Sequence, residues 1–244
     1  MRCQPRYEGQ VYICLKNVQT CLLCDEPAEA ETPMCMACEA ELPWLMGQCR
    51  TCALPLPESG LTCADCLLEP PAFEQVAVPW LYGFPVDSLI TRFKHNAKWP
   101  FGHLLADVLG QYLQYRFDED LPRPDVLLPV PLASKRLRQR GFNQAAMLAR
   151  WLSLKLDLPC DEQVLCRIQD TRAQQDLDAK ARKRNLRNAF ALTPQVDVRG
   201  RHLALIDDVL TTGATAQALA RLLMNAGAAR VDVYCLARTP KSGS

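Results

Sequence analysis

Apolar positions in the second half of the chain follow two patterns. Short continuous apolar runs occupy Val126–Val130 and Leu203–Ile206, and Arg230–Ala237 is rich in β-branched and aromatic residues. Such runs predict strands covered on both faces. Helical spacing appears in the stretch QAAMLARWLSLKLD, which follows Asn143 as a cap, and in Thr215–Ala226, which a glycine ends. Strands alternating with helices predict an α/β domain with a mainly parallel sheet, whose ligand site lies at the carboxyl ends of the strands.

A cysteine repeat dominates the N-terminal part. Four CxxC pairs follow one another, and the last two repeat the first two at an offset of 28 residues. Each unit reads C-x2-C-x10-C-x2-C, a spacing that closes a tetrahedral four-sulfur shell around one metal ion. A redox role is disfavoured because no βαβ pattern surrounds the pairs. The ligands predicted for two structural Zn²⁺ ions are Cys21, Cys24, Cys35, Cys38, Cys49, Cys52, Cys63 and Cys66. Sequential sites fit the tandem repeat better than an interleaved cross-brace, although both pairings are open.

Composition and charge divide the chain into two regions. Its 244 residues are 49% hydrophobic and 23% charged, which excludes a disordered or collagen-like polymer. Residues 1–73 hold four Lys or Arg against ten Asp or Glu, whereas residues 74–244 hold 24 against 17. Because an acidic module repels a polyanion, we interpret the cysteine-rich region as a scaffold or protein-contact element.

A proline pair marks the boundary between these regions. Neither a helix nor a central strand continues through Glu69-Pro70-Pro71-Ala72-Phe73. We therefore expect an N-terminal extension over residues 1–20, a double zinc ribbon over 21–68, a linker over 69–75 and the α/β domain over 76–240. No secretory signal pattern and no run of roughly 18–20 apolar residues is visible, so we expect a cytoplasmic protein without membrane insertion.

Aromatic and histidine residues carry weaker signals. Core packing is favoured over a base-stacking platform for the aromatic cluster, because apolar rather than basic residues are interleaved with it. The cluster comprises Trp80, Tyr82, Phe84, Phe93, Trp99 and Phe101. The histidines are isolated, without a partner at metal-ligand spacing, so none is assigned a role; they are His95, His103 and His202.

The stretch LALIDDVLTTGAT, residues 203–215, carries the sharpest chemical signal. A strand ends in two adjacent carboxylates, turns through Thr-Thr-Gly and enters a helix. Backbone N–H groups of residues 211–215 predict an anion cradle, in which threonine hydroxyls add donors and Gly213 permits close approach. Asp207 and Asp208 would repel a bare phosphate, but they accept hydrogen bonds from sugar hydroxyls and attract Mg²⁺. The combination predicts a ribose-phosphate site; the Lys of a Walker loop and a GxGxxG motif are both missing from it.

This motif resembles that of the type I phosphoribosyltransferases, which is an apolar strand, two acidic residues, two apolar residues and TTGxT. A narrower resemblance spans about residues 21–238. Three features are similar to the competence-protein-F family, whose members are called DNA-utilisation proteins in some bacteria. They are the segment LLPVPLASKRLRQRGFNQAAMLA, the pattern R-x-x-N-x-x-x-x-F at Arg182, Asn185 and Phe190, and the double zinc ribbon. The resemblance implies a type I phosphoribosyltransferase fold and a bacterial cytosolic accessory role in handling incoming single-stranded DNA, in transformation or as a nutrient.

The resemblance also implies roles for individual residues. Asp207 and Asp208 would act as the catalytic pair and hold the ribose of phosphoribosyl pyrophosphate (PRPP), directly or through Mg²⁺. The 5′-phosphate would be bound by Thr211, Thr212, Gly213 and Thr215. The turn Pro131–Arg140 has no carboxylate, and its candidate pyrophosphate ligands are Ser134, Lys135, Arg136 and Arg140. The alternative is that this turn is only a solvated basic surface. Residues 167–187 are the candidate flexible loop over the site, with an alignment uncertain by one residue; its candidates are Arg172, Gln174, Gln175, Arg182 and Asn185.

Two functions of different classes follow. The first is a binding accessory of DNA uptake, in which the PRPP site senses a metabolite or grips a nucleotide while the zinc module contacts a partner such as a helicase. Single-stranded DNA would engage the basic face of residues 74–244, with residues 167–187, Arg199, Arg201 and His202 as the best candidates. The second is an active phosphoribosyltransferase that transfers to an unidentified base or amine with Mg²⁺-dependent release of pyrophosphate. The accessory role is favoured because nothing in the sequence identifies an acceptor pocket.

Overall fold

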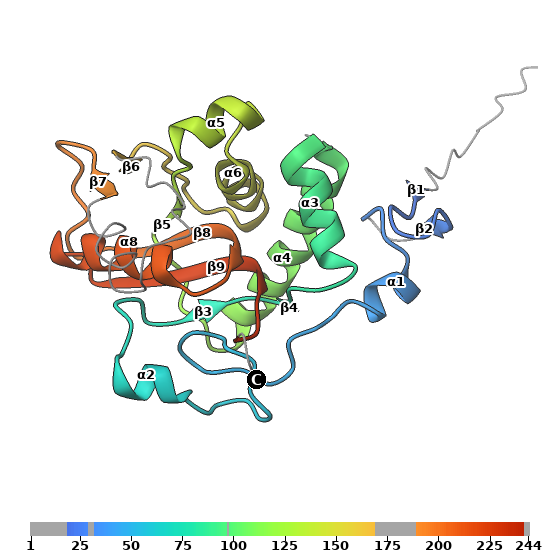
Figure 1. Cartoon of the computed structure of the whole chain (residues 1–244), viewed down its shortest axis with the longest axis horizontal. Helices are drawn as coiled ribbons and strands as arrows, with labels where there is room; N and C mark the ends of the chain where they lie inside the picture. The colour runs from blue at the N-terminus through green and yellow to red at the C-terminus, as the bar shows by residue number, and fades with distance from the viewer. Residues whose placement is uncertain (1–18, 29–31, 97, 169–188, 242–244) are drawn as a thin grey trace, which may run out of the picture.

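The computed structural model describes residues 19–28, 32–96, 98–168 and 189–241 (Figure 1). The elements up to the central sheet are β1 (Gln19–Thr20), β2 (Pro27–Ala28), α1 (Met36–Ala40), α2 (Ala64–Leu68), β3 (Val76–Ala77), β4 (Trp80–Leu81), α3 (Val86–Asn96) and α4 (Trp99–Glu119). The remaining elements are β5 (Val126–Pro129), α5 (Ser134–Arg140), α6 (Gln144–Leu156), β6 (Leu165–Arg167), β7 (Phe190–Leu192), β8 (His202–Leu210), α8 (Ala214–Asn225) and β9 (Arg230–Arg238).

A parallel sheet forms the centre of the molecule, as the sequence predicts. Its strand order is β3-β9-β8-β5, and β4 also pairs with β9. All four pairings, including β4 with β9, are parallel. Strand β8 continues four residues past Ile206, where the apolar run ends, because Asp207 pairs with Cys235 and Leu210 with Arg238 on β9. Asp207 and Asp208 therefore lie within β8, and not in the loop that follows it.

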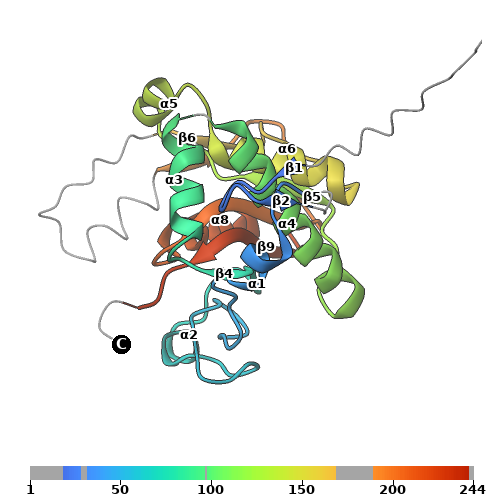
Figure 2. The same cartoon turned by 90° about the vertical axis from the view of Figure 1, so that its right-hand side faces the viewer.

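Side chains alternate between two apolar layers along β8. Leu203 and Leu205 belong to a buried cluster that includes α8, whereas Ala204 and Ile206 belong to a cluster that includes α4 and α6. Helices therefore cover both faces of the sheet (Figures 1 and 2). Helix α6 begins as predicted, with Asn143 Oδ1 accepting the backbone N–H of Ala145 at 3.1 Å.

The zinc-ribbon region packs against the α/β domain in two places. Cys21 lies in the buried cluster with α3 and α4, and Ala53 lies in the cluster with β8 and α8. Between these contacts the chain runs beside β4, where the N–H of Leu45 donates to the carbonyl of Pro79 at 2.8 Å. Figure 1 shows β1, β2 and α1 on the side of α3 and α4, and α2 below the sheet.

The aromatic cluster is only partly a core. Trp80, Phe93 and Phe101 are buried. The exposed fractions of the others are 38% for Tyr82, 81% for Phe84 and 40% for Trp99. Trp99 nevertheless packs, because its ring centroid lies 4.9 Å from that of Phe142 and 6.2 Å from that of Trp151. The expectation of core packing is therefore wrong only for Tyr82 and Phe84. No helix among the described residues combines the length and apolar character needed to cross a membrane.

Candidate functional site

The eight cysteines of the repeat gather into two clusters. In each cluster the four sulfur atoms lie within 4.8 Å of one another; the members are Cys21, Cys24, Cys35 and Cys38 in the first and Cys49, Cys52, Cys63 and Cys66 in the second. The sequential pairing is thus confirmed. Burial raises the pKa of Cys52 to about 11, and four thiols this close do not all ionise without a cation. A four-sulfur donor set of this kind suits a structural zinc ion.

The phosphate loop lies at the carboxyl end of β8. Thr211 and Thr212 are exposed, and Gly213 adopts a left-handed φ of 73° before α8 begins. A Cβ on Gly213 would meet no atom within 4 Å, so the backbone conformation, not crowding, favours glycine. The first turn of α8 holds no acidic residue. Its N-terminal end therefore keeps the positive partial charge that attracts an anion.

The adjacent carboxylates are incompletely partnered. Asp207 Oδ1 accepts the backbone N–H of Asp208 at 2.8 Å, and Asp208 Oδ1 pairs with Lys94 Nζ at 3.0 Å. The second oxygen of Asp208, Oδ2, is buried and meets no hydrogen-bond donor among the described residues. Burial, together with the charge of Asp208, raises the pKa of Asp207 to about 7. The pair has spare acceptor capacity that suits a cation or sugar hydroxyls.

Lys94 is a site residue that the sequence pattern does not reveal. It lies on α3, and its side chain is 19% exposed where it meets Asp208. Its neighbour Phe93 is fully buried, which anchors this turn of the helix. No motif links Lys94 to β8 in the sequence, because only the packing of α3 near the end of the sheet brings them together.

The basic segment after β5 is a short helix and not the predicted turn. Helix α5 runs from Ser134 to Arg140 and ends at Gly141, which has a left-handed φ of 81°. Parallel pairing of Pro129 with Ile206 places this segment and the phosphate loop at the same edge of the sheet. The predicted pyrophosphate ligands Ser134, Lys135 and Arg136 are exposed, and Arg140 donates to Gln144 Oε1 at 2.8 Å. Their role in binding stays a prediction.

The predicted flexible-loop residues lie outside the described part of the chain; they are Arg172, Gln174, Gln175, Arg182 and Asn185. The residues on either side form an antiparallel ribbon of β6 and β7, in which Arg167 pairs with Phe190. The guanidinium of Arg167 lies 5.2 Å from the centre of the Phe190 ring. The ribbon thus joins the two ends of the candidate loop.

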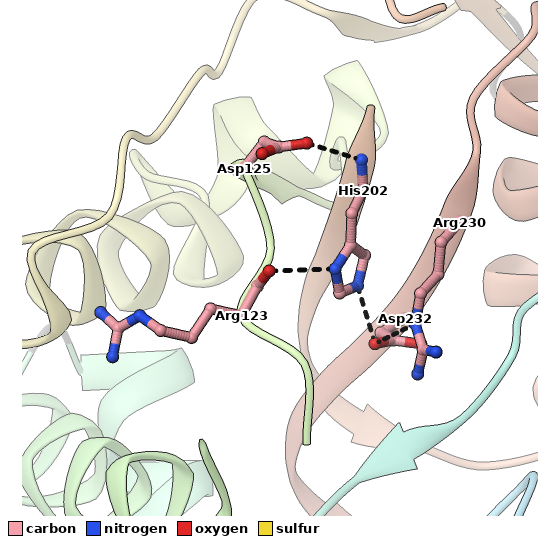
Figure 3. A network of polar contacts seen from close by, with 5 residues as sticks. All are labelled: Arg123, Asp125, His202, Arg230 and Asp232. Atoms are coloured by element: carbon pink, nitrogen blue, oxygen red, sulfur yellow. Dashed lines mark hydrogen bonds and ion pairs between the residues drawn. The ribbon is translucent and has the colours of Figure 1, made fainter. Parts of the chain in front are cut away.

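His202 has hydrogen-bond partners in the structure, although no metal-ligand group among the described residues includes it. Its Nε2 lies 2.8 Å from Asp232 Oδ2, its Nδ1 lies 3.1 Å from the carbonyl of Arg123, and its backbone N–H donates to Asp125 Oδ2 (Figure 3). Arg230 Nε donates to the same Asp232 oxygen at 3.0 Å. Pairing of β8 with β9 brings Asp232 and Arg230 to His202, and pairing of β8 with β5 brings Arg123 and Asp125 there. The sequence spacing does not show these contacts. It lies at the amino end of β8, opposite the phosphate loop.

Comparisons with known proteins agree with both parts of the fold. A double zinc ribbon domain matches residues 18–67, and a phosphoribosyl transferase domain matches residues 139–244. The chain is 37% identical over 221 residues to the DNA utilization protein YhgH of Salmonella typhi, covering 90% of this chain and 96% of that protein. It is 36% identical over 180 residues to competence protein F of Haemophilus influenzae, covering 72% and 78%. A purine phosphoribosyltransferase from Pyrococcus horikoshii Ot3 is a remote structural neighbour, with 18% identity, 57% and 76% coverage and a TM-score of 0.36.

The matched residues include both cysteine clusters and the phosphate loop, so the similarity covers the two features described above. The chain therefore belongs to the family of competence protein F and the DNA utilization proteins, in which a double zinc ribbon precedes a phosphoribosyltransferase domain of type I fold.

Proposed function

We propose that the α/β domain binds PRPP or a nucleotide with Mg²⁺ at the carboxyl end of β8. We also propose that the protein is a cytoplasmic accessory in the uptake, processing or nutritional use of DNA. The second part rests on its relatives, of which one is called a DNA utilization protein and the other a competence protein. The first part rests on the geometry of the phosphate loop.

The observation that carries the proposal is the unpartnered Oδ2 of Asp208 beside an exposed threonine loop. Buried oxygens are nearly always hydrogen-bonded, so an exception in a surface-accessible strand end favours a missing ligand. The ribose hydroxyls or Mg²⁺ would fill the capacity of Asp207 and Asp208. The 5′-phosphate would take the N–H groups of residues 211–215, where the helix end is positive.

The remaining charges at this edge suit a pyrophosphate. Helix α5 contributes four basic side chains and no carboxylate; these are Lys135, Arg136, Arg138 and Arg140. Mg²⁺ would neutralise the charge of the pyrophosphate oxygens. Lys94 neutralises Asp208 in the ligand-free protein, so an incoming cation would replace it or share the carboxylate.

The complete set of ribose and phosphate ligands also supports an alternative, an active phosphoribosyltransferase. In that case a base or amine would attack the anomeric carbon, the bond to pyrophosphate would break, and pyrophosphate would leave. The accessory role is favoured because no group of described residues is identifiable as a binding pocket for an acceptor base or amine. Pyrophosphate release with a panel of bases and amines separates the two functions.

Calorimetry with PRPP tests the binding proposal. We expect binding in the presence of Mg²⁺, weaker binding with a chelator, and a large loss of affinity when Asp207→Asn and Asp208→Asn are combined. Thr212→Val removes one hydroxyl donor worth about 0.5–1.5 kcal/mol and should cost less. Absence of any PRPP binding by the wild-type protein would refute the site and leave the fold intact.

Single-stranded DNA and a helicase are the macromolecular partners that we propose. The basic face of residues 74–244 would bind DNA, and the acidic zinc module would contact the helicase. The cluster of Arg182, Lys183 and Arg184 lies outside the described residues, so its assignment rests on charge alone. Charge reversal at these three positions should weaken DNA binding and its salt dependence. DNA binding by the fragment 1–73 alone would show that the assignment is wrong.

A further inference from the structure

Arg238 links the second cysteine cluster to the phosphate loop. It is the last residue of β9 and is 6% exposed. Its Nε donates to the carbonyl of Cys52 at 3.0 Å, and its Nη1 donates to the carbonyl of Leu210 at 3.1 Å and also to the carbonyl of Thr211. One rigid guanidinium therefore holds the backbone of a metal ligand and the backbone of the anion-binding loop.

The partners of Arg238 are all neutral carbonyls. In addition to the three above, Nη1 donates to the carbonyl of Thr239 at 2.8 Å. Among the described residues no carboxylate forms an ion pair with Arg238. A buried cation without a counterion is costly unless anions lie nearby. A zinc-bound thiolate cluster beyond the carbonyl of Cys52 and a phosphate at the loop beyond the carbonyl of Thr211 would supply such anions once both are bound.

Packing around the second cluster reinforces the link. Ala53, which follows Cys52, is fully buried in the same apolar cluster as Leu210 and Ala216. The backbone N–H of Ala72 donates to the side chain of Gln217, in the first turn of α8, at 2.7 Å. A residue within the second cluster's segment and a residue after it thus pack with the end of β8 and with α8.

Among the described residues, the first cluster makes none of these contacts. Cys24, the counterpart of Cys52, is exposed, and Cys21 lies in the buried cluster that contains α3, α4 and the opposite face of β8 but no described residue of α8. The same spacing of cysteines thus occurs in two different settings. This difference supplies a natural control within one chain.

We propose that Arg238 is a positioning residue that couples metal occupancy of the second cysteine cluster to the conformation of the phosphate loop. Metal binding fixes the CxxC turn and hence the carbonyl of Cys52. That carbonyl orients the guanidinium, which holds Leu210 and Thr211 so that the following N–H groups face the anion. The effect on PRPP rests on the proposed function, whereas the effect on the loop does not.

Hydrogen exchange of the full-length, ligand-free protein tests the coupling without any ligand. In Arg238→Gln we expect both metal ions to be retained and a peptide covering residues 207–217 to exchange about tenfold faster or more. In Cys52→Ser we expect one ion to be lost and the same peptide to exchange faster. In Cys24→Ser one ion should be lost while this peptide exchanges at the wild-type rate. Elemental analysis of zinc checks the occupancies.

A double variant shows whether the coupling passes through Arg238. Exchange in Arg238→Gln with Cys52→Ser should be no faster than in Cys52→Ser alone, because the link is already broken. Additive effects, or wild-type exchange of residues 207–217 in either single variant, would overturn the proposal. Arg123→Gln is the matched control, since Arg123 also donates to a backbone carbonyl but lies at the amino end of the sheet.

Calorimetry with Mg²⁺ and PRPP then separates this inference from the proposed function. Affinity should fall about tenfold in Arg238→Gln, equivalent to about 1.4 kcal/mol, and stay at the wild-type value in Arg123→Gln. If the wild-type protein binds no PRPP while the exchange results are as expected, the coupling stands and the proposed ligand is wrong. If PRPP binds and Arg238→Gln changes neither affinity nor exchange, the coupling is wrong and the ligand site stands.

Discussion

The two ends of the β8–β9 pair hold buried carboxylates with opposite hydrogen-bonding states. At the amino end Asp232 is fully buried, and both of its oxygens accept hydrogen bonds from Arg230, with His202 on one of them (Figure 3). At the carboxyl end Asp208 has one ion pair, to Lys94, and one buried oxygen without a donor. A saturated network leaves no capacity for a ligand and stabilises the fold. An unsaturated one costs stability and is typical of a binding site.

Asp232→Ala should cause the largest change. It removes the common partner of Arg230 and His202, and loss of one member of a buried charged network costs about 3–5 kcal/mol. Urea denaturation should show this fall in the free energy of unfolding, while PRPP affinity stays the same. Asp197→Ala is the control, because its pair with Arg199 is exposed, and it should have no measurable effect. Equal stability of the two variants would show that the network is not structural.

Asp208→Asn should show the reverse pattern. It removes a like charge beside Asp207 as well as the pair with Lys94, so we expect the free energy of unfolding to change by less than about 1 kcal/mol. The affinity for PRPP with Mg²⁺ should fall at least tenfold, that is by about 1.4 kcal/mol. Denaturation and calorimetry on the same preparation measure both quantities. An unchanged affinity would remove Asp208 from the site.

The pH dependence of stability tests Asp207. Its pKa is about 7 in the folded protein, against an ordinary value of 3.8, so the folded state binds more protons between these values. The stability contribution is therefore full below pH 3.8 and is lost as the pH rises through about 7. At about 1.4 kcal/mol for each pKa unit, ligand-free wild-type protein should lose on the order of 4 kcal/mol over this range relative to Asp207→Asn. Parallel pH profiles of the two proteins would contradict the raised pKa.

Lys94→Met should give the smallest effect. Lys94 competes with a cation for Asp208, and partly exposed ion pairs contribute about 0.2–1 kcal/mol. We therefore expect the Mg²⁺ concentration needed for half-maximal PRPP binding to fall about two- to fivefold in this variant. Titration of Mg²⁺ at fixed PRPP measures it. A higher requirement for Mg²⁺ would show that Lys94 assists binding and does not compete.

The sequence predicts features whose chemistry is local. The cysteine spacing predicts the two clusters, and the motif at residues 203–215 predicts the turn between β8 and α8. Its Gly213 is favoured by a left-handed φ of 73°, and not by the close approach that the sequence suggests. Asn143 likewise predicts the start of α6. These features depend on turns and caps within a few residues, so their residue types are diagnostic.

Contacts between distant elements could not be predicted in this way. Lys94 reaches Asp208 only through the packing of α3, and Arg238 reaches Cys52 only because β9 ends beside the second cluster. The partners of His202 come from the pairing of β8 with β9 on one side and with β5 on the other. The helix α5 was missed because a run of basic residues carries no apolar periodicity.

A crystal structure of the protein with Mg²⁺ and PRPP tests the central claim most directly. The account predicts the 5′-phosphate on the backbone N–H groups of residues 211–215, and the ribose hydroxyls or Mg²⁺ on Asp207 and Asp208. The network at Asp232 should be unchanged. PRPP bound elsewhere, for example on the surface near Arg199 and Arg201, with the second oxygen of Asp208 still unpartnered, would contradict it.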